Sequence, residues 1–88
     1  MKVLKFGSAT CPGCAVMKPR WAEIESENDW LATEFFDIDE NPDAAEKWGI
    51  DEIPQFIFLD KNGAEIERYK GEVDKDLLVA TIRELRNR

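Results

Sequence analysis

Apolar residues along this chain alternate between short β-prone runs and stretches with helical spacing. The run Val3-Leu4-Lys5-Phe6 is mostly apolar and is followed by Gly7-Ser8, so it predicts a strand. Between residues 12 and 28, apolar side chains recur at spacings of one, four and three, which predicts a helix; they are Val16, Met17, Trp21 and Ile24. Pro19 falls inside this helix and should kink it, because proline has no N–H to donate.

Three further strands are predicted in the remainder of the chain. Residues 33–38 and residues 55–59 are apolar and β-prone, and residues 65–70 follow with a similar character. Asp60-Lys61-Asn62-Gly63 lies between the last two runs and predicts a tight hairpin turn, since Asn-Gly readily takes positive φ angles.

Two further helices complete the pattern. Asn41 as N-cap and Pro42 at the first helical position predict a short helix through about Trp48, which Gly49 ends. Asp74 is a plausible cap for a final helix with an apolar face made of Leu77, Leu78, Ile82 and Leu85. The order β-α-β-α-β-β-α predicts an α/β fold with a mixed four-stranded sheet flanked by helices.

Composition narrows the class of protein. With 88 residues, of which 43% are hydrophobic and 35% charged, we expect one domain over residues 1–88. A net charge of −7 argues against a nucleic-acid binder, because phosphate contacts need clustered Lys and Arg. We expect no signal peptide and no membrane span, because no apolar stretch is long enough. Only two cysteines occur, so we expect a cytoplasmic protein rather than a disulfide-rich secreted one.

Both cysteines lie in Cys11-Pro12-Gly13-Cys14, between the first strand and the first helix. At a helix start the free N–H groups and the helix dipole stabilise a thiolate, so the pKa of a thiol falls there. Cys14 follows one turn later, near enough for a disulfide, while Pro12 fixes one φ angle and Gly13 permits tight geometry. The position predicts a redox couple in which Cys11 attacks a substrate disulfide and Cys14 resolves the mixed disulfide.

Two other uses of the cysteine pair are less well supported. A zinc site needs four nitrogen or sulfur ligands, and this chain has two cysteines and no histidine. We therefore expect no metal site unless a second chain or an outside thiol supplies ligands. A structural disulfide would close too short a loop to contribute much stability.

Several motifs together resemble the thioredoxin family over essentially the whole chain. They are CPGC at a helix start, Pro19, the segments DIDENPDAAEKWGI and EIPQFIFLDKNG, and Gly71. The resemblance implies a thioredoxin fold and a thiol–disulfide oxidoreductase that reduces protein disulfides without a bound cofactor and is recharged by a thioredoxin reductase.

The resemblance also assigns roles to single residues. It implies that Cys11 is the nucleophile and Cys14 the resolving thiol. It makes Pro54 a cis-proline, although a trans bond is the commoner state of an X-Pro peptide. The Ile53 backbone would pair with the substrate chain like an added strand, and Gly71 would leave room in the substrate groove.

This chain departs from the family pattern at several points. It begins directly at the family's second strand, which predicts a minimal fold that lacks the usual first strand and helix. The family's buried Asp corresponds to Lys5 and its Lys partner to Phe35. The Lys5 ammonium could stabilise the Cys14 thiolate or accept a proton; alternatively it extends to solvent and has no role.

Two alternative functions stay open from the sequence. A glutaredoxin-like enzyme recharged by glutathione is favoured by the length and by Pro12. Against it, the Gly-Gly segment followed by acidic residues that glutaredoxins use for glutathione is missing. A redox-silent binding subunit or metal-bridged dimer with the same fold is the other alternative. For the oxidoreductase we expect a monomer.

Overall fold

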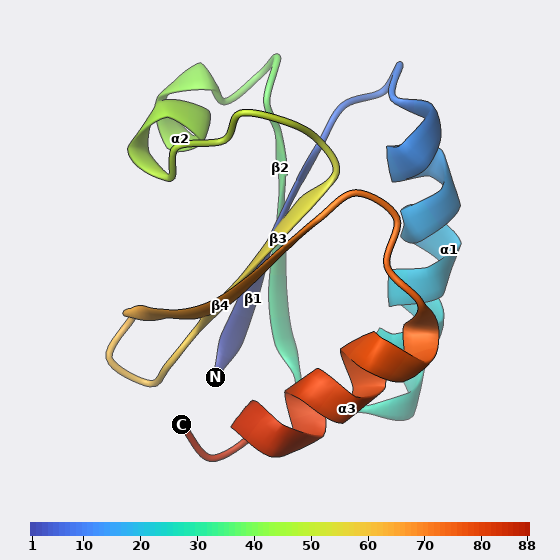
Figure 1. Ribbon diagram of the computed structural model, residues 1–88, viewed down its shortest axis with the longest axis vertical. Coiled ribbons are helices and arrows are strands. Elements are labelled where there is room, and N and C mark those ends of the chain that lie inside the picture. Colours follow the sequence, from blue (N-terminus) through green and yellow to red (C-terminus); the bar gives the residue numbers. More distant parts are fainter.

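The computed structural model describes residues 1–88 and contains four strands and three helices (Figure 1). Their order is the predicted one: β1 (Lys2–Gly7), α1 (Pro12–Glu27), β2 (Ala32–Asp37), α2 (Pro42–Lys47), β3 (Gln55–Leu59), β4 (Glu65–Lys70) and α3 (Lys75–Leu85). Strands β3 and β4 have the predicted bounds, whereas β2 begins and ends one residue before the predicted 33–38. Helix α1 continues on both sides of Pro19.

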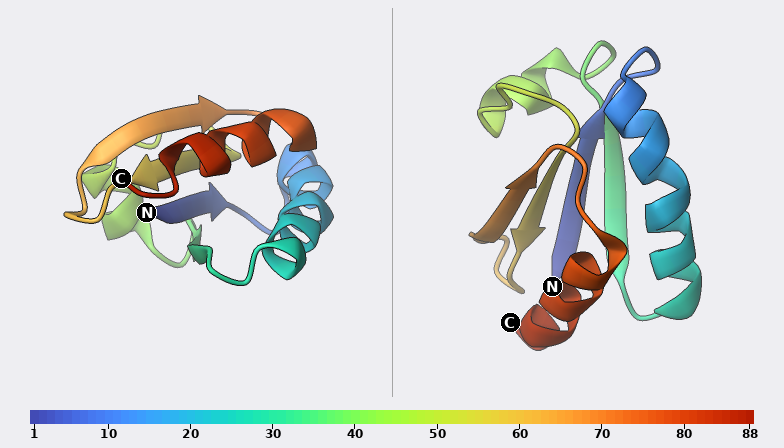
Figure 2. Two further views of the ribbon diagram at one scale, coloured as in Figure 1. Left: turned by 90° about the horizontal axis from the view of Figure 1, so that it is seen from below. Right: turned by 45° about the vertical axis from the view of Figure 1, so that its right-hand side comes forward.

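The four strands form one mixed sheet in the order β2-β1-β3-β4. Strand β1 pairs in parallel with β2 and antiparallel with β3, and β3 pairs antiparallel with β4. Helices α1 and α3 lie against one face of the sheet, and α2 lies on the opposite side (Figure 1, Figure 2). The predicted mixed four-stranded sheet flanked by helices is therefore confirmed, and the predicted thioredoxin-like order of elements with it.

Alternation along β1 and β3 sends side chains to both faces of the sheet. The larger buried cluster lies between the sheet and helices α1 and α3; it comprises Val3, Met17, Trp21, Ile24, Phe56, Phe58, Val73, Leu78, Ile82 and Leu85. The smaller one, on the α2 side, comprises Leu4, Phe6, Ile57 and Leu59. Every residue of β3 is buried, which explains why its sequence is continuously apolar apart from Gln55.

Two residues predicted to lie on apolar helix faces are instead exposed. Val16 is 41% exposed and Leu77 is 48% exposed. Each immediately precedes a fully buried residue, Met17 or Leu78, and neighbours on a helix point about 100° apart, so only one of the two can face the sheet. On α3 the buried face includes Thr81, whose hydroxyl donates to Leu77 O (2.8 Å) and lies 2.8 Å from the Tyr69 hydroxyl.

The predicted turn and caps form with small differences. At the β3–β4 turn the Asp60 carboxylate accepts the backbone N–H groups of Ala64 (2.9 Å) and Asn62 (2.8 Å). These bonds hold the pKa of Asp60 below its ordinary value. Gly63 has a φ of 83°, whereas Asn62 does not take the positive φ that the Asn-Gly pair suggested. Asn41 and Asp74 are the N-caps as predicted, but neither side chain makes a capping hydrogen bond.

Helices α1 and α3 are tied together on the surface. Lys75 at the start of α3 forms ion pairs with Glu23 and with Glu27 of α1, the latter at 2.9 Å. The hydrogen bond to Glu23 is the main cause of a raised pKa for Lys75. None of the helices has the length and apolar character needed to cross a bilayer.

We predict that Leu78→Ala destabilises the protein by about 2–5 kcal/mol, because it removes a fully buried side chain and leaves a cavity. Leu77→Ala is the matched control. It makes the same substitution one position earlier on the same helix, and should change the free energy of unfolding by no more than about 0.5 kcal/mol. Urea unfolding of both variants measures the difference, and equal losses would contradict the orientation of α3.

Candidate active site

The two cysteines meet at the turn from β1 into α1. Cys11 and Cys14 form a disulfide, with Cα atoms 5.2 Å apart. Cys11 is the N-cap of α1 with extended backbone angles (φ −90°, ψ 114°), and Pro12 is the first helical residue. Proline suits that position because its fixed φ is already helical and its missing N–H has no partner there. The predicted pairing of Cys11 with Cys14 is thus confirmed.

The Cys11 sulfur lies at the positive end of α1 and accepts a backbone hydrogen bond there. The Cys14 backbone N–H donates to Cys11 Sγ at 3.1 Å, so the sulfur acts as the helix cap. No acidic side chain lies in the first turn of α1. The hydrogen bond favours negative charge on the Cys11 sulfur, and the absence of acidic side chains leaves that charge unopposed.

Two glycines allow the close packing around the disulfide. A Cβ atom on Gly7, at the end of β1, would lie 3.0 Å from Cys14 Sγ and 3.3 Å from a Phe35 ring carbon. A Cβ on Gly13 would lie 3.1 Å from Pro54 Cδ. We expected Gly13 to permit tight turn geometry. The nearness of Pro54 is a second reason for glycine at this position, because a side chain there would crowd the proline ring. The sequence pattern indicated Gly7 only as the end of a strand, and no local signal distinguishes it as a neighbour of Cys14.

The Ile53-Pro54 segment lies against this first helical turn, and its peptide bond is cis, as the family resemblance implied. Pro54 is buried, and its carbonyl accepts the Gly71 N–H at 2.8 Å. Gly71 has a φ of 82°. The N–H and C=O of Ile53 take part in no hydrogen bond within the protein. The fold therefore brings Cys11, Pro54 and Gly71 to one end of the sheet and leaves the Ile53 backbone groups unpaired.

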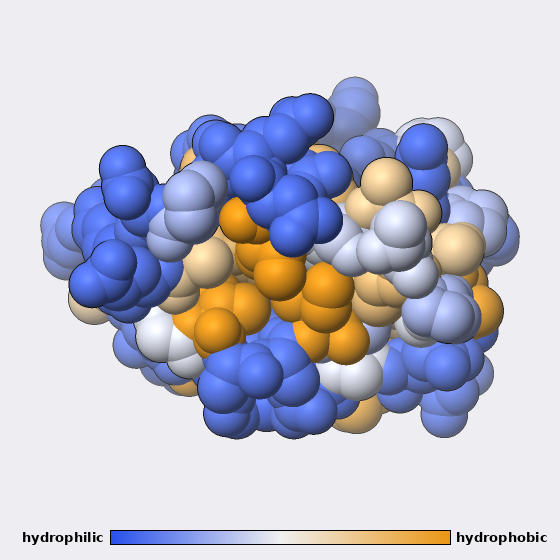
Figure 3. Space-filling model, turned by 90° about the horizontal axis from the view of Figure 1, so that it is seen from above, coloured by the Kyte–Doolittle hydropathy of each residue, from blue (hydrophilic) through white to orange (hydrophobic).

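This end of the molecule carries apolar surface framed by hydrophilic side chains (Figure 3). An open cavity of about 620 Å³ lies beside the disulfide. Its lining is mostly apolar and includes both cysteines, Lys5, Trp21 and Phe35. Trp21 is buried, and its indole N–H has no partner. No group of three or more His, Cys, Asp or Glu side chains is arranged to hold a metal ion.

Lys5 does not extend freely into solvent. Its side chain is 15% exposed, and its Nζ donates to Glu25 Oε2 of α1 at 2.6 Å. The same carboxylate oxygen accepts the Thr33 hydroxyl at 3.1 Å, and the ammonium lies 5.8 Å from the centre of the Trp21 ring. Sequence reasoning singled out Lys5 but missed Glu25. The available signal was a lysine inside a strand that α1 covers, because such a charge requires a partner on the covering helix.

Comparisons with known proteins agree with this geometry. A model of the thioredoxin family matches residues 1–84. A thioredoxin from Chlamydia muridarum is 35% identical over 80 residues, which cover 91% of this chain and 78% of that protein. The crystal structure of a thioredoxin from Nicotiana alata superposes with a TM-score of 0.87 at 30% identity, covering 94% of this chain and 70% of that one. Thioredoxin 1 from Thermosipho africanus gives a TM-score of 0.83 at 28% identity, covering 96% and 92%.

Proposed function

The chain belongs to the thioredoxin family and is a thiol–disulfide oxidoreductase, and we propose that it reduces disulfides in protein substrates by exchange at Cys11 and Cys14. The family resemblance drawn from the motifs is thereby confirmed, and the redox-silent alternative is set aside. The roles of the individual site residues are part of the proposal.

The proposed reaction is a two-electron exchange in two steps. In the first, the Cys11 thiolate attacks one sulfur of the substrate disulfide; a mixed disulfide forms, and the other substrate sulfur leaves as a thiolate that takes a proton from water. In the second, Cys14 loses its proton and attacks Cys11 Sγ. The Cys11–Cys14 disulfide forms and the second substrate thiol is released. The substrate gains two electrons and two protons, and the enzyme dithiol becomes the disulfide.

The hydrogen bond from the Cys14 N–H to Cys11 Sγ is the observation that carries the assignment of the nucleophile. In the dithiol form the same N–H is available to a Cys11 thiolate at the positive end of α1, whereas Cys14 lies one turn inside the helix. The contact of Cys14 Sγ with Gly7 places that sulfur against the end of β1. Cys11 is therefore the better site of first attack, and Cys14 the better resolving group.

The substrate chain would bind along Ile53. The unpaired N–H and C=O of this residue lie beside cis-Pro54 and can pair with an extended peptide in the manner of strand addition. Gly71 supports this binding, because no side chain projects from the position that follows β4. Pro12 and Gly13 would contact the peptide next to the reacting sulfur.

We propose Lys5 as a modulator of Cys14. Both residues line the same cavity, so the positive charge of Lys5 favours the thiolate that Cys14 must form in the second step. Glu25 positions the ammonium through their 2.6 Å ion pair.

The remaining parts of the proposal concern the partners. Because each turnover leaves the Cys11–Cys14 disulfide, the enzyme needs an electron donor, which we propose to be a thioredoxin reductase. No bound cofactor takes part in the exchange. A monomer suffices, since one chain supplies every proposed site residue. We place the enzyme in the cytoplasm, where a reducing pool keeps the dithiol form available.

We predict that Cys11→Ser abolishes insulin reduction, while Cys14→Ser stops at the mixed disulfide and accumulates a covalent complex with the substrate. Non-reducing gels after thiol alkylation measure the complex. Full activity of Cys11→Ser, or a complex trapped by Cys11→Ser rather than by Cys14→Ser, would contradict the assigned roles.

We predict that NADPH with thioredoxin reductase returns the oxidised enzyme to the dithiol, and that glutathione with glutathione reductase does so much more slowly. Consumption of NADPH in the presence of insulin compares the two systems. Faster recycling by glutathione would favour the glutaredoxin-like alternative.

We predict that Lys5→Met moves the pH–rate profile of insulin reduction to higher pH and lowers the rate at neutral pH roughly three- to tenfold, because Cys14 loses a nearby positive charge. Thermal stability should change little, because methionine fills the largely buried space of the lysine side chain and Glu25, which is one-third exposed, keeps its hydrogen bond from Thr33. Lys2→Met is the matched control, because Lys2 lies on the same strand as Lys5 but forms an exposed ion pair with Glu34 of β2. An unchanged pH profile in Lys5→Met would rule out the proposed role.

A further inference from the structure

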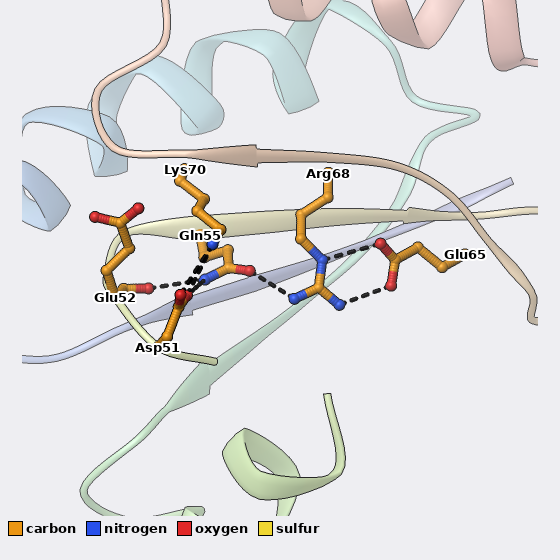
Figure 4. Close-up of polar contacts among 6 residues, drawn as sticks. All are labelled: Asp51, Glu52, Gln55, Glu65, Arg68 and Lys70. Atoms are coloured by element: carbon orange, nitrogen blue, oxygen red, sulfur yellow. Dashed lines mark hydrogen bonds and ion pairs between the residues drawn. The ribbon is translucent and has the colours of Figure 1, made fainter. Parts of the chain in front are cut away.

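A buried amide lies directly behind the proposed peptide-binding segment. Gln55 follows Pro54 as the first residue of β3, and its side chain is fully buried. It belongs to a polar group with Asp51, Glu52, Glu65, Arg68 and Lys70, which joins the segment before β3 to strand β4 (Figure 4). We call this group the β4 clamp.

Gln55 forms the centre of the β4 clamp. Its Nε2 donates to the backbone carbonyl of Glu52 at 3.0 Å and to Asp51 Oδ1 at 3.3 Å. Its Oε1 accepts from Arg68 Nη1 at 2.7 Å. A buried amide that loses these partners leaves costly unpaired groups, so the three bonds restrict where residues 51 and 52 can lie relative to β4.

The β4 end of the clamp is itself held in place. Arg68 donates to both carboxylate oxygens of Glu65, at 2.9 and 2.6 Å, which fixes the plane of the guanidinium. Lys70 pairs with Asp51 at 3.0 Å, and this hydrogen bond is the main reason that the pKa of Asp51 lies below its ordinary value. The Lys70–Asp51 pair is exposed, so the part-buried contact between Gln55 and Arg68 is the stronger tie.

Apart from the clamp, the segment is held mainly by apolar packing, of Ile53 against the smaller buried cluster and of Pro54 beside Gly13. Residues 51–54 lie outside the helices and strands, and their only backbone–backbone hydrogen bond is the one that the Pro54 carbonyl accepts from Gly71. Ile53 lies between the clamped residues and Pro54, and contributes no backbone hydrogen bond of its own. Packing alone does not fix the direction of its free N–H and C=O, so their orientation depends on the side-chain bonds of the neighbouring residues.

We propose that Gln55 and Arg68 are positioning residues that hold the Ile53 backbone for pairing with a substrate chain, and so favour disulfides in polypeptides over small disulfides. The inference rests on the proposed function. A small disulfide needs only the Cys11 sulfur, whereas a polypeptide also needs correctly placed partners for its backbone. Loss of the clamp should therefore act on one class of substrate and spare the other.

The test compares two disulfides in a single turnover. The reduced enzyme is mixed with insulin or with the small disulfide 5,5′-dithiobis(2-nitrobenzoate), without a reductase, and the second-order rate constants are measured. For Gln55→Leu and Arg68→Met, the rate constant with insulin should fall roughly three- to tenfold, while that with the small disulfide stays within about twofold. Arg68→Lys keeps a donor for Gln55 Oε1 and should recover part of the loss.

Controls separate positioning from general stability. Lys2→Met removes an ion pair at the opposite end of β1 and should leave the ratio of the two rate constants unchanged. If Gln55→Leu does not fold, Arg68→Met, on the partly exposed β4, still provides the test. Equal losses with both substrates, or no loss with insulin, would overturn the positioning role. A wild-type enzyme that reduces the small disulfide but not insulin would instead overturn the proposed function, and the inference with it.

Discussion

The first turn of α1 packs closely between the end of β1 and Pro54, and the rest of the site depends on this constraint. The end of β1 passes so near Cys14 that a side chain on Gly7 would crowd its sulfur, and a side chain on Gly13 would crowd Pro54 on the other side of the turn. These two contacts hold the disulfide between β1 and the segment before β3. Because β1 and β3 are adjacent strands, with Phe6 opposite Gln55, the sheet register determines which residues face the cysteines.

Two polar contacts accompany this constraint, one on each face of the sheet. On the α1 face, Lys5 lies beside the larger apolar cluster and is paired with Glu25. On the α2 side, Gln55 is buried and bonded to Arg68. Each is a polar residue in a core strand near the site, and burial of such groups is tolerated only where partners satisfy them.

Much of the architecture was predictable from the sequence, because apolar runs, turn residues and helix caps each involve residues that are neighbours in the chain. The continuous apolar run of β3, the Asp60–Gly63 turn and the capping residues Asn41 and Asp74 each indicate an element from neighbouring residues alone, and the observed elements agree within one or two residues. The predicted apolar faces were less accurate. Val16 and Leu77 fit a helical spacing, but their burial depends on how α1 and α3 are rotated against the sheet, which spacing alone does not define.

By itself the sequence determined the order of the elements, the redox chemistry of the Cys11–Cys14 pair and, through family motifs, the cis peptide bond at Ile53-Pro54. These features depend on residues that are close together in the chain or on a pattern shared with relatives. Only the tertiary structure decided that Gly7 lies against Cys14, that Glu25 is the partner of Lys5, and that Gln55 and Arg68 tie the segment before β3 to β4. Each of these contacts joins residues distant in sequence, and the side chains that meet are set by strand register and helix rotation, which are properties of the packed core as a whole.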